Sequence, residues 1–364
     1  MFSQSFTLIH DNSMKQVIFV GWVRTGKPPV DGETAKNQYI IAELEKYCKV
    51  TVLDFYQKNR HPWIYLQALW ALVSQPKATI IFSTSAKNVY GTLKLFRALN
   101  LKRDVIHWVI GGKFGDNIQN GLFDADVFGY AKLTFVESHA MVKQLQECGI
   151  KGVSQLPNFK AIPYFPDLQN ALNERRQSPK KRFVFLSRVM PEKGCDYILE
   201  AIKVLNGKGL HNRFSVDFYG KMDEAYEEKF TQKVNQLDNA NYHGLLDLKT
   251  AAGYDTLATY HAMLFPTYWK GEGFAGVFID AFIAGLPMLV SDWAHNSEII
   301  RDGELGILYP VHDVKALADT MEKCILGEVN LEEMAVHARN EASRYDAVQV
   351  LNEDYLQSIG LIER

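Results

Sequence analysis

The chain alternates short apolar runs with longer segments of mixed polarity. In its first half the apolar runs lie at 15–22, 49–55, 78–84, 104–112 and 132–138. The segments between them, such as 37–48 and 139–149, have the length and mixed polarity of helices. Strands that alternate with helices are typical of a parallel sheet covered on both faces. This half therefore predicts a doubly wound α/β domain.

The same pattern returns after a polar, proline-marked stretch, "FPDLQNALNERRQSPKKR". Its apolar runs lie at 182–189, 214–220, 240–244, 262–267 and 287–292. We therefore predict two Rossmann-like domains, with a C-terminal helix that packs back towards the first domain. The predicted ranges are 1–165, a linker at 166–181, 182–345 and the C-terminal helix at 346–364. Ligands of such sheets bind at the carboxyl ends of the strands, so the interdomain cleft is the expected site.

Composition narrows the class of protein. With 364 residues and 47% apolar content the chain can bury two cores, and a net charge of −2 gives no general field for nucleic acid. The four cysteines form no CxxC pair, which favours reduced thiols in a cytosolic protein over a disulfide scaffold or zinc site. No signal peptide or membrane span is expected. The segment "WIYLQALWALV" (63–73) predicts a buried or half-buried helix, with membrane-surface contact as the alternative.

The block "FLSRVMPEKGCDYILEAI" (185–202) has the composition of an anion site. A strand ends at Ser187, a turn carries Arg188 and Lys193, and Gly194 opens a helix. Arginine can bind two phosphate oxygens at once, lysine adds a point charge, and helix amides add partial positive charge. These residues predict a diphosphate site, although two solvated surface cations would give the same local pattern.

The block "KGEGFAGVFIDAFIAGLP" (270–287) carries two acids around a glycine turn and an apolar helix. Gly273 and Gly276 let a ligand approach the backbone, and the start of the helix favours an anion. Asp280 shares a helical face with Gly276, and ionised carboxylates accept hydrogen bonds from sugar and ribose hydroxyls. A phosphate cradle between two hydroxyl acceptors, Glu272 and Asp280, predicts a nucleotide-sugar site.

At this point the second half resembles the retaining glycosyltransferases of family four, which have the GT-B fold. Three of the family's elements occur in its order within 185–320: "SRVMPEKG", "PTYWKGEGFAGVFIDAFIAGLPML" and "SDWAHNSEIIRDGELGILYPVHDVKALAD". The first half is similar more loosely, through "PPVDGETAKNQ", "TFVESHAMVKQL" and "QLPN". The resemblance implies a GT-B enzyme of bacterial polysaccharide-biosynthesis type.

The resemblance also implies roles for individual residues. Arg188, Lys193 and Glu272 form the catalytic set, in which the two cations bind the donor diphosphate and Glu272 contacts the donor sugar. The other donor-binding positions are Gly32, Gly244, Leu245, Gly273, Phe274, Ala275, Gly276, Val277 and Asp280. Lys113, Ser138 and His295 are candidates for the acceptor side of the cleft. No metal ligand is expected, because Arg188 and Lys193 would neutralise the leaving diphosphate.

Two departures from the family pattern bear on the site. Asp280 stands where the family usually has glutamate, one methylene longer. Many members carry a histidine just after a central N-domain strand, whereas here that strand contains His107 and is followed by Gly111, Gly112 and Lys113. We therefore interpret His107 as structural and Lys113 as a speculative replacement.

The remaining candidates are weaker. The "DAD" at 124–126 is similar to a metal-binding DxD, but it precedes a strand, so surface or helix-capping use is the expected role. The histidines His10, His61 and His139 lack metal-ligand spacing. Asn296 and His295 replace small residues of a family turn.

The expected activity is transfer of a sugar from a nucleoside-diphosphate sugar to a hydroxyl of a glycan or lipid-linked glycan, with retention and without a metal or other cofactor. We expect a cytoplasmic enzyme at the inner face of the membrane, with no nucleic-acid partner. The alternatives are a GT-B-like sugar-nucleotide epimerase, a glycosidase and a non-catalytic nucleotide-sugar-binding protein.

Overall fold

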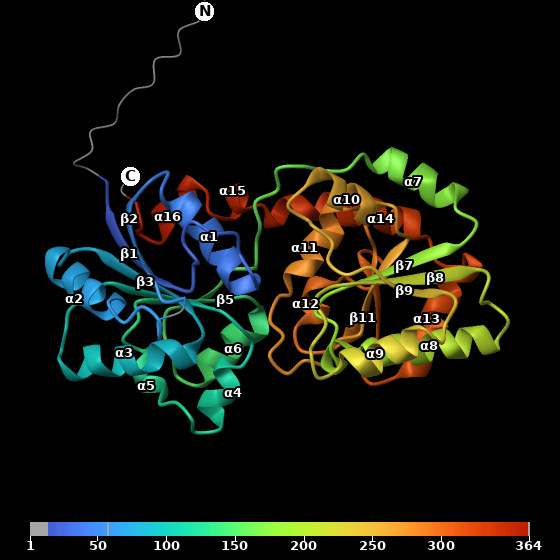
Figure 1. Cartoon of the computed structure of the whole chain (residues 1–364). Coiled ribbons are helices and arrows are strands. Elements are labelled where there is room, and N and C mark those ends of the chain that lie inside the picture. The colour runs from blue at the N-terminus through green and yellow to red at the C-terminus, as the bar shows by residue number, and fades with distance from the viewer. Residues whose placement is uncertain (1–13, 57, 363–364) are drawn as a thin grey trace, which may run out of the picture.

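The computed structural model describes residues 14–56 and 58–362. These residues form two α/β domains that lie side by side (Figure 1), each built on a six-stranded sheet in which every strand pair is parallel. This confirms the predicted fold class of two doubly wound domains.

The N-terminal sheet has the strand order β2-β1-β3-β4-β5-β6. Its strands are β1 (Gln16–Gly21), β2 (Lys49–Asp54), β3 (Thr79–Thr84), β4 (Val105–Val109), β5 (Leu133–Val136) and β6 (Val153–Gln155). Its helices are α1 (Gly32–Leu44), α2 (Ile64–Ser74), α3 (Ala86–Ala98), α4 (Phe114–Gln119), α5 (Ala125–Phe128) and α6 (His139–Glu147). The five apolar runs of this half correspond to β1 to β5, whereas the three-residue edge strand β6 was not predicted.

The C-terminal sheet has the order β12-β11-β10-β7-β8-β9. Its strands are β7 (Lys181–Leu186), β8 (Phe214–Tyr219), β9 (Ala240–Tyr242), β10 (Ala262–Phe265), β11 (Met288–Asp292) and β12 (Gly306–Pro310). The helices are α7 (Leu168–Gln177), α8 (Cys195–Gly207), α9 (Glu227–Val234), α10 (Ala251–Ala258), α11 (Gly276–Ile283), α12 (Asn296–Ile299), α13 (Val314–Leu326) and α14 (Leu331–Ala342). The predicted runs match β7 to β11, and the edge strand β12 was again missed.

Each sheet is buried on both faces, as the continuous apolar character of its strands requires. Along β7, Phe183 and Phe185 enter the core beneath α8 and α13, whereas Val184 enters the core beneath α10 and α11. In the N-terminal sheet one face packs against α2, α3 and α6, and the other against α1. This layering leaves the carboxyl ends of both sheets free to face the cleft.

The end of the chain crosses back to the N-terminal domain. Beyond a short 3₁₀ turn at 343–345, the backbone pairs with Lys160 on both sides, through Tyr345 and Ala347. The last helices, α15 (Ala347–Val350) and α16 (Glu353–Ser358), then contribute Leu351 and Leu356 to the core that contains α1 (Figure 1).

The segment predicted as a linker contains a helix, α7, that packs on the C-terminal domain. Its Arg175 is buried and donates hydrogen bonds to the backbone carbonyls of Ala258, Ala284 and Gly285. The polar composition of 165–182 favoured a linker over a helix, because the buried residues of α7 are few, namely Ala171, Leu172 and Arg175.

Two further expectations have structural outcomes. The segment 63–73 is largely the half-buried helix α2, although many of its apolar side chains face outward. All four cysteines are free thiols, as expected. None of the described helices combines the length and hydropathy needed to cross a membrane.

Candidate functional site

Two cavities lie along the boundary between the domains. The first, about 620 Å³, is lined by α1, the Asn158–Lys160 segment, the loop before α10 and the start of α11. The second, about 740 Å³, is lined by the loop after β4 with α4, by α6, and by the loops that follow β10 and β11. The backbones of the two domains meet between the cavities, where a Cβ on Gly112 would overlap the carbonyl oxygen of Glu272.

Lys193 and Glu272 meet beside the second cavity. Lys193 Nζ lies 2.6 Å from Glu272 Oε2, which also accepts a hydrogen bond of 2.7 Å from the Thr267 hydroxyl. Both charged side chains are buried. Lys193 ends a 3₁₀ turn at Gly194, whose φ is 82° and whose Cβ position would overlap the Pro266 carbonyl. Only glycine fits there, so the "EKG" sequence fixes the direction of Lys193.

Two more cations converge on Trp269, in the loop between β10 and Glu272. The guanidinium carbon of the exposed Arg188 lies 5.6 Å from the centre of the Trp269 ring, and Lys113 Nζ lies 5.8 Å from it. Lys113 comes from the other domain, at the start of α4. The structure therefore places Arg188, Lys193 and Lys113 around one edge of the cleft.

The glycine-rich turn before α11 is held by the N-terminal domain. The Phe274 amide donates to Glu137 Oε2 at 2.9 Å, and Asn158 Nδ2 donates to the Phe274 carbonyl at 2.9 Å. The other oxygen of Glu137 binds Lys36 Nζ at 2.6 Å, in a buried ion pair. A Cβ on Gly273 would lie 2.5 Å from Glu137 Oε2, so this contact requires glycine.

The start of α11 opens into the first cavity. Ala275 is its N-cap residue and makes no side-chain cap, while Gly276, Val277 and Asp280 line the cavity opposite Gly32. Because Gly276 and Asp280 both line this cavity, the prediction that they share one helical face is confirmed. The first amides of a helix have no partner within the helix, so those of α11 can bind a ligand there.

Both oxygens of Asp280 have protein partners. Oδ2 lies 2.6 Å from Lys160 Nζ, and Oδ1 accepts a hydrogen bond of 2.8 Å from the Tyr254 hydroxyl. Burial, and then the charge and hydrogen bond of Asp280, raise the pKa of Tyr254 and keep its hydroxyl protonated. Asp280 is thus held from both sides by Lys160 and Tyr254.

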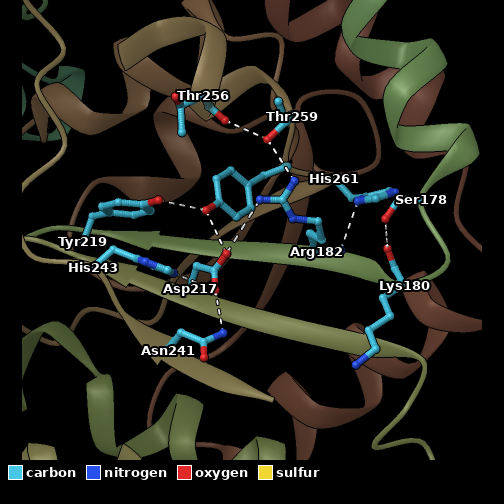
Figure 2. A network of polar contacts seen from close by, with 11 residues as sticks. Ser178, Lys180, Arg182, Asp217, Tyr219, Asn241, His243, Thr256, Thr259 and His261 are labelled. Carbon is cyan, nitrogen blue, oxygen red and sulfur yellow. Dashed lines mark hydrogen bonds and ion pairs between the residues drawn. The ribbon is translucent and has the colours of Figure 1, made fainter. Parts of the chain in front are cut away.

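A polar network supports the turn that carries Gly244 and Leu245 (Figure 2). Asp217, a buried residue of β8, accepts hydrogen bonds from Tyr260 and Asn241 at 2.8 and 3.0 Å and lies 3.2 Å from His243 Nε2. The turn itself lines neither cavity; the following residues, 246 to 251, line the first one. Gly244 adopts a φ of 75°, which glycine accommodates without strain.

The acceptor-side candidates divide between two environments. Lys113 and His295 line the second cavity, and burial lowers the pKa of His295. Ser138 lines neither cavity, because its buried side chain caps α6 by accepting a hydrogen bond from the Met141 amide. Asn296, beside His295, is buried and donates to the Ser291 carbonyl.

Several remaining sequence interpretations have clear outcomes. His107 is fully buried within β4, and burial lowers its pKa to about 4, which confirms a structural role. Asp124 caps α5 by accepting from the Asp126 amide, which confirms capping for the "DAD" sequence. In residues 14–56 and 58–362, no group of three His, Cys, Asp or Glu side chains could hold a metal ion. His10 lies outside the described residues.

On the N-domain side of the cleft the sequence analysis named Gly32 and Lys113, which line the two cavities, but it assigned no role to Lys36, Glu137 or Lys160. Lys36 and Glu137 lie inside the loosely similar segments of the first half, whereas Lys160 lies outside them. A weak signal existed for Lys36, since it lies four residues after Gly32 and so on the same helical face. Glu137 and Lys160 carry no local signal, because their partners are more than 100 residues away.

Residues 170–344 match the sequence model of the family described as "Glycosyl transferases group 1". A relative named 2-deoxystreptamine N-acetyl-D-glucosaminyltransferase, from Niallia circulans, is 30% identical over 162 residues. That alignment spans 44% of this chain and 40% of the relative. The matched region thus spans about two fifths of this relative's length.

Two solved structures are similar over nearly the whole chain. Anabaena HepE in complex with UDP has a TM-score of 0.70 at 16% identity, and covers 95% of this chain and 99% of its own. Sucrose-phosphate synthase from Thermosynechococcus elongatus has a TM-score of 0.70 at 14% identity, with the same two coverages. The chain has the GT-B fold, and residues 170–344 match the glycosyltransferase group 1 family.

Proposed function

From this fold and domain we propose that the chain is a retaining glycosyltransferase. It transfers a sugar from a nucleoside-diphosphate sugar to a hydroxyl of a glycan or lipid-linked glycan, and it needs no metal. The observation that carries the proposal is the Lys193–Glu272 pair at 2.6 Å, buried beside the contact between the domains. A buried cation at that point can bind the diphosphate of the donor, and the carboxylate beside it can accept hydrogen bonds from the hydroxyls of the donor sugar.

The donor diphosphate would lie between the start of α11 and the cations on the opposite side of the turn. Negative charge develops on this diphosphate as its bond to the anomeric carbon breaks. Lys193, Arg188 and the first amides of α11 would stabilise that charge through electrostatic preorganisation. Lys193 would then exchange its carboxylate partner, Glu272, for phosphate oxygens.

Glu272 and Asp280 would bind neutral hydroxyls at the two ends of the donor. Glu272 Oε1 has no hydrogen bond to the protein among the described contacts, whereas Oε2 binds Lys193 and Thr267, so Oε1 can accept a sugar hydroxyl. The first cavity would hold the nucleoside, with the ribose near Asp280 and Lys160 and the base near residues 246 to 250.

The second cavity would receive the acceptor. Its lining combines Trp293 with amide, acidic and basic side chains, a composition suited to sugar hydroxyls. In the proposed step the acceptor oxygen forms a bond to the anomeric carbon on the face from which the diphosphate leaves. The acceptor proton passes to a diphosphate oxygen, so the products are the glycoside and the nucleoside diphosphate.

The comparisons support the polar nature of both substrates. The Niallia relative is named for transfer of N-acetylglucosamine, and another relative, 23% identical over 177 residues, is named as a capsular polysaccharide glycosyltransferase of Staphylococcus aureus. HepE was solved with UDP. A lipid-linked glycan acceptor would place the reaction at a cytoplasmic membrane surface.

A donor screen tests the class of ligand. Thermal unfolding should be measured with UDP-, GDP-, ADP- and dTDP-sugars, since a ligand at a hundred times its Kd stabilises the folded state by about 2.7 kcal/mol. We expect one nucleotide class to raise the Tm clearly above the others. Donor binding without hydrolysis or transfer to any acceptor would instead support a non-catalytic nucleotide-sugar-binding protein.

Lys193→Ala tests the leaving-group role. Removing one charge-stabilising donor typically lowers kcat by about 10²- to 10³-fold, so we expect a loss of that size in donor hydrolysis or transfer. Lys203→Ala is the matched control, because Lys203 is an exposed lysine of the same domain outside the cleft. Turnover of Lys193→Ala within twofold of the wild type, with unchanged folding, would contradict this role.

A further inference from the structure

Helix α2 is apolar on its exposed side as well as its buried side. Ile64 and Ala71 face the core, whereas Trp63, Trp70 and Val73 are 69%, 68% and 73% exposed. We define the α2 surface as the exposed apolar side chains Trp63, Tyr65, Leu66, Leu69, Trp70 and Val73. A helix that is apolar all round is normally buried, so the α2 surface indicates a missing partner.

The α2 surface continues onto α3 across an apolar groove. This groove, about 530 Å³, lies between α2 and α3 and is lined by the exposed Leu69 and Leu95 from its two walls. Leu99, beyond the end of α3, is also exposed. The apolar area therefore spans two helices.

The chain segment that forms this area carries charges of one sign. Between Asp54 and Asp104 the chain has no acidic residue over 49 positions, although 42 acids in 364 residues would place about five or six there. The same stretch has eight cations, namely Lys58, Arg60, Lys77, Lys87, Lys94, Arg97, Lys102 and Arg103. A chain with a net charge of −2 therefore carries a formal charge of +8 on the segment that contains α2 and α3, of which Arg97 lies 3.6 Å from Asp126.

We propose that the α2 surface docks on an anionic lipid bilayer. Trp, Leu and Val side chains enter the boundary between headgroups and acyl chains, while surrounding Lys and Arg side chains bind lipid phosphates. A second copy of the chain is disfavoured as the partner, because a symmetric dimer would bring two sets of cations together. Nucleic acid is disfavoured because it offers no apolar environment for Leu66, Leu69 and Val73.

The position of α2 suits this role. Figure 1 shows α2 at the outer edge of the N-terminal domain, on the side away from the C-terminal domain. A bilayer bound there would leave the interdomain cleft open to solvent. The groove extends from Leu95 to Gly21 and Thr84, which end β1 and β3 at the cleft edge of the sheet. A substrate anchored in the same bilayer would thus be held close to the cleft.

The inference rests on the α2 surface and on the cations of the same segment, and not on the proposed activity. Vesicle binding needs neither donor nor acceptor, so it can succeed where transfer fails, and the reverse. The test is co-sedimentation of the full chain with vesicles of phosphatidylcholine and of an equimolar mixture with phosphatidylglycerol. We expect strong binding to the anionic vesicles only, weakened by added salt.

Two pairs of variants separate the apolar and the charged contributions. We expect Trp63→Ser with Trp70→Ser to reduce the bound fraction at least about tenfold, and Lys87→Gln with Lys94→Gln to reduce binding and its salt dependence. The matched controls are Leu326→Ser with Val348→Ser and Lys151→Gln with Lys323→Gln, all exposed positions outside α2 and α3. These controls should bind as the wild type does. Thermal unfolding of every variant checks that it is folded.

Insertion is measured separately through tryptophan fluorescence. Lipids brominated on their acyl chains should quench wild-type emission, and Trp63→Ser with Trp70→Ser should lose this quenching. Several results would overturn the proposal: no binding to anionic vesicles, equal binding by the tryptophan variant, or a dimer in solution that the tryptophan variant dissociates. Tight binding to RNA with none to vesicles would overturn it as well.

Discussion

At the residue scale, Asp280 and Lys160 form a pair whose members come from opposite sides of the cleft. Lys160 belongs to the segment between β6 and α7, and its Nζ lies 2.6 Å from Asp280 Oδ2. Asp280 is buried, and removing one member of a buried ion pair leaves an uncompensated charge. The shorter acid thus has a charged partner at this position, Lys160.

We expect Asp280→Asn to weaken nucleotide binding. Asparagine keeps the shape of the side chain and can still accept from Tyr254, but it loses the charge that would bind ribose hydroxyls and Lys160. Hydrogen bonds to charged groups contribute about 1.5–3 kcal/mol, so the Kd should rise about 10- to 100-fold by calorimetry. Tyr254→Phe is the control, since it removes one hydrogen bond and no charge. An unchanged Kd for Asp280→Asn would exclude a ribose contact.

His261 makes the stability of the C-terminal domain depend on pH. Its Nδ1 accepts from the Arg182 amide at 3.0 Å and its Nε2 lies 2.9 Å from the Arg175 carbonyl, an arrangement that the neutral ring satisfies (Figure 2 shows the Arg182 contact). Burial lowers its pKa from 6.5 to about 4. Between these values the unfolded chain binds a proton that the folded chain does not.

The contribution of His261 is therefore complete above pH 6.5 and is lost as the pH falls towards 4, by about 1.4 kcal/mol per pH unit. His261→Asn, whose side-chain oxygen can still accept from Arg182, should show a smaller decrease. Urea unfolding at several pH values in this range measures both slopes. Identical slopes would mean that His261 titrates normally in the folded protein.

At the scale of elements, α7 joins the ends of two helices. The Arg175 guanidinium binds carbonyls at the C-terminal ends of α10 and α11, groups that have no partner within their own helices. We expect Arg175→Met to cost about 3 kcal/mol of unfolding free energy, because buried carbonyls lose their donor. Arg176→Met, at the exposed neighbour paired with Glu332, should change stability little. Equal Tm values for the two variants would contradict this account.

Sequence patterns predicted the central strands of both sheets from their apolar runs. The two strands that were missed, β6 and β12, are edge strands with few buried residues, although the edge strands β2 and β9 were predicted. Helix α7 was missed because its buried face is narrow, with Ala171, Leu172 and the cation Arg175 in an otherwise polar segment. The strands β6 and β12 and the helix α7 thus depend on tertiary contacts that no local pattern encodes.

The residues of the site likewise fall into those that the sequence predicted and those that it did not. Glu272, Gly276 and Lys193 lie in continuous motifs whose glycines and charges face one cleft, so their sequence spacing predicts a shared site. Glu137 and Lys160 meet Phe274 and Asp280 across the cleft, through partners more than 100 residues away. These contacts of the N-domain half could therefore not be predicted from sequence spacing.

At the scale of the whole molecule, polar contacts join the domains across the cleft, among them the Asn158–Phe274 hydrogen bond described above and three that involve charged side chains. Glu137 binds the Phe274 amide, Lys160 binds Asp280, and Glu298 accepts from the first two amides of α6 at 2.7 and 2.9 Å. Two of these contacts place a carboxylate on backbone amides that open towards the cleft. The arrangement is a closed one in which protein carboxylates occupy amides near the proposed substrate positions.

Glu298 provides the test of this closed arrangement, because it lies outside the proposed donor site. Glu298→Ala removes a charged acceptor from the start of α6, where helix amides favour negative charge, and so weakens the domain contact. We expect the radius of gyration, measured by small-angle X-ray scattering, to increase in the variant and to return towards the wild-type value when the donor is added. Glu304→Ala is the matched control, since Glu304 pairs with Arg301 within the C-terminal domain. If the two variants scatter alike, closure depends on the contacts of Glu137 and Lys160 alone, and the equivalent measurement on Glu137→Gln would then show the opening.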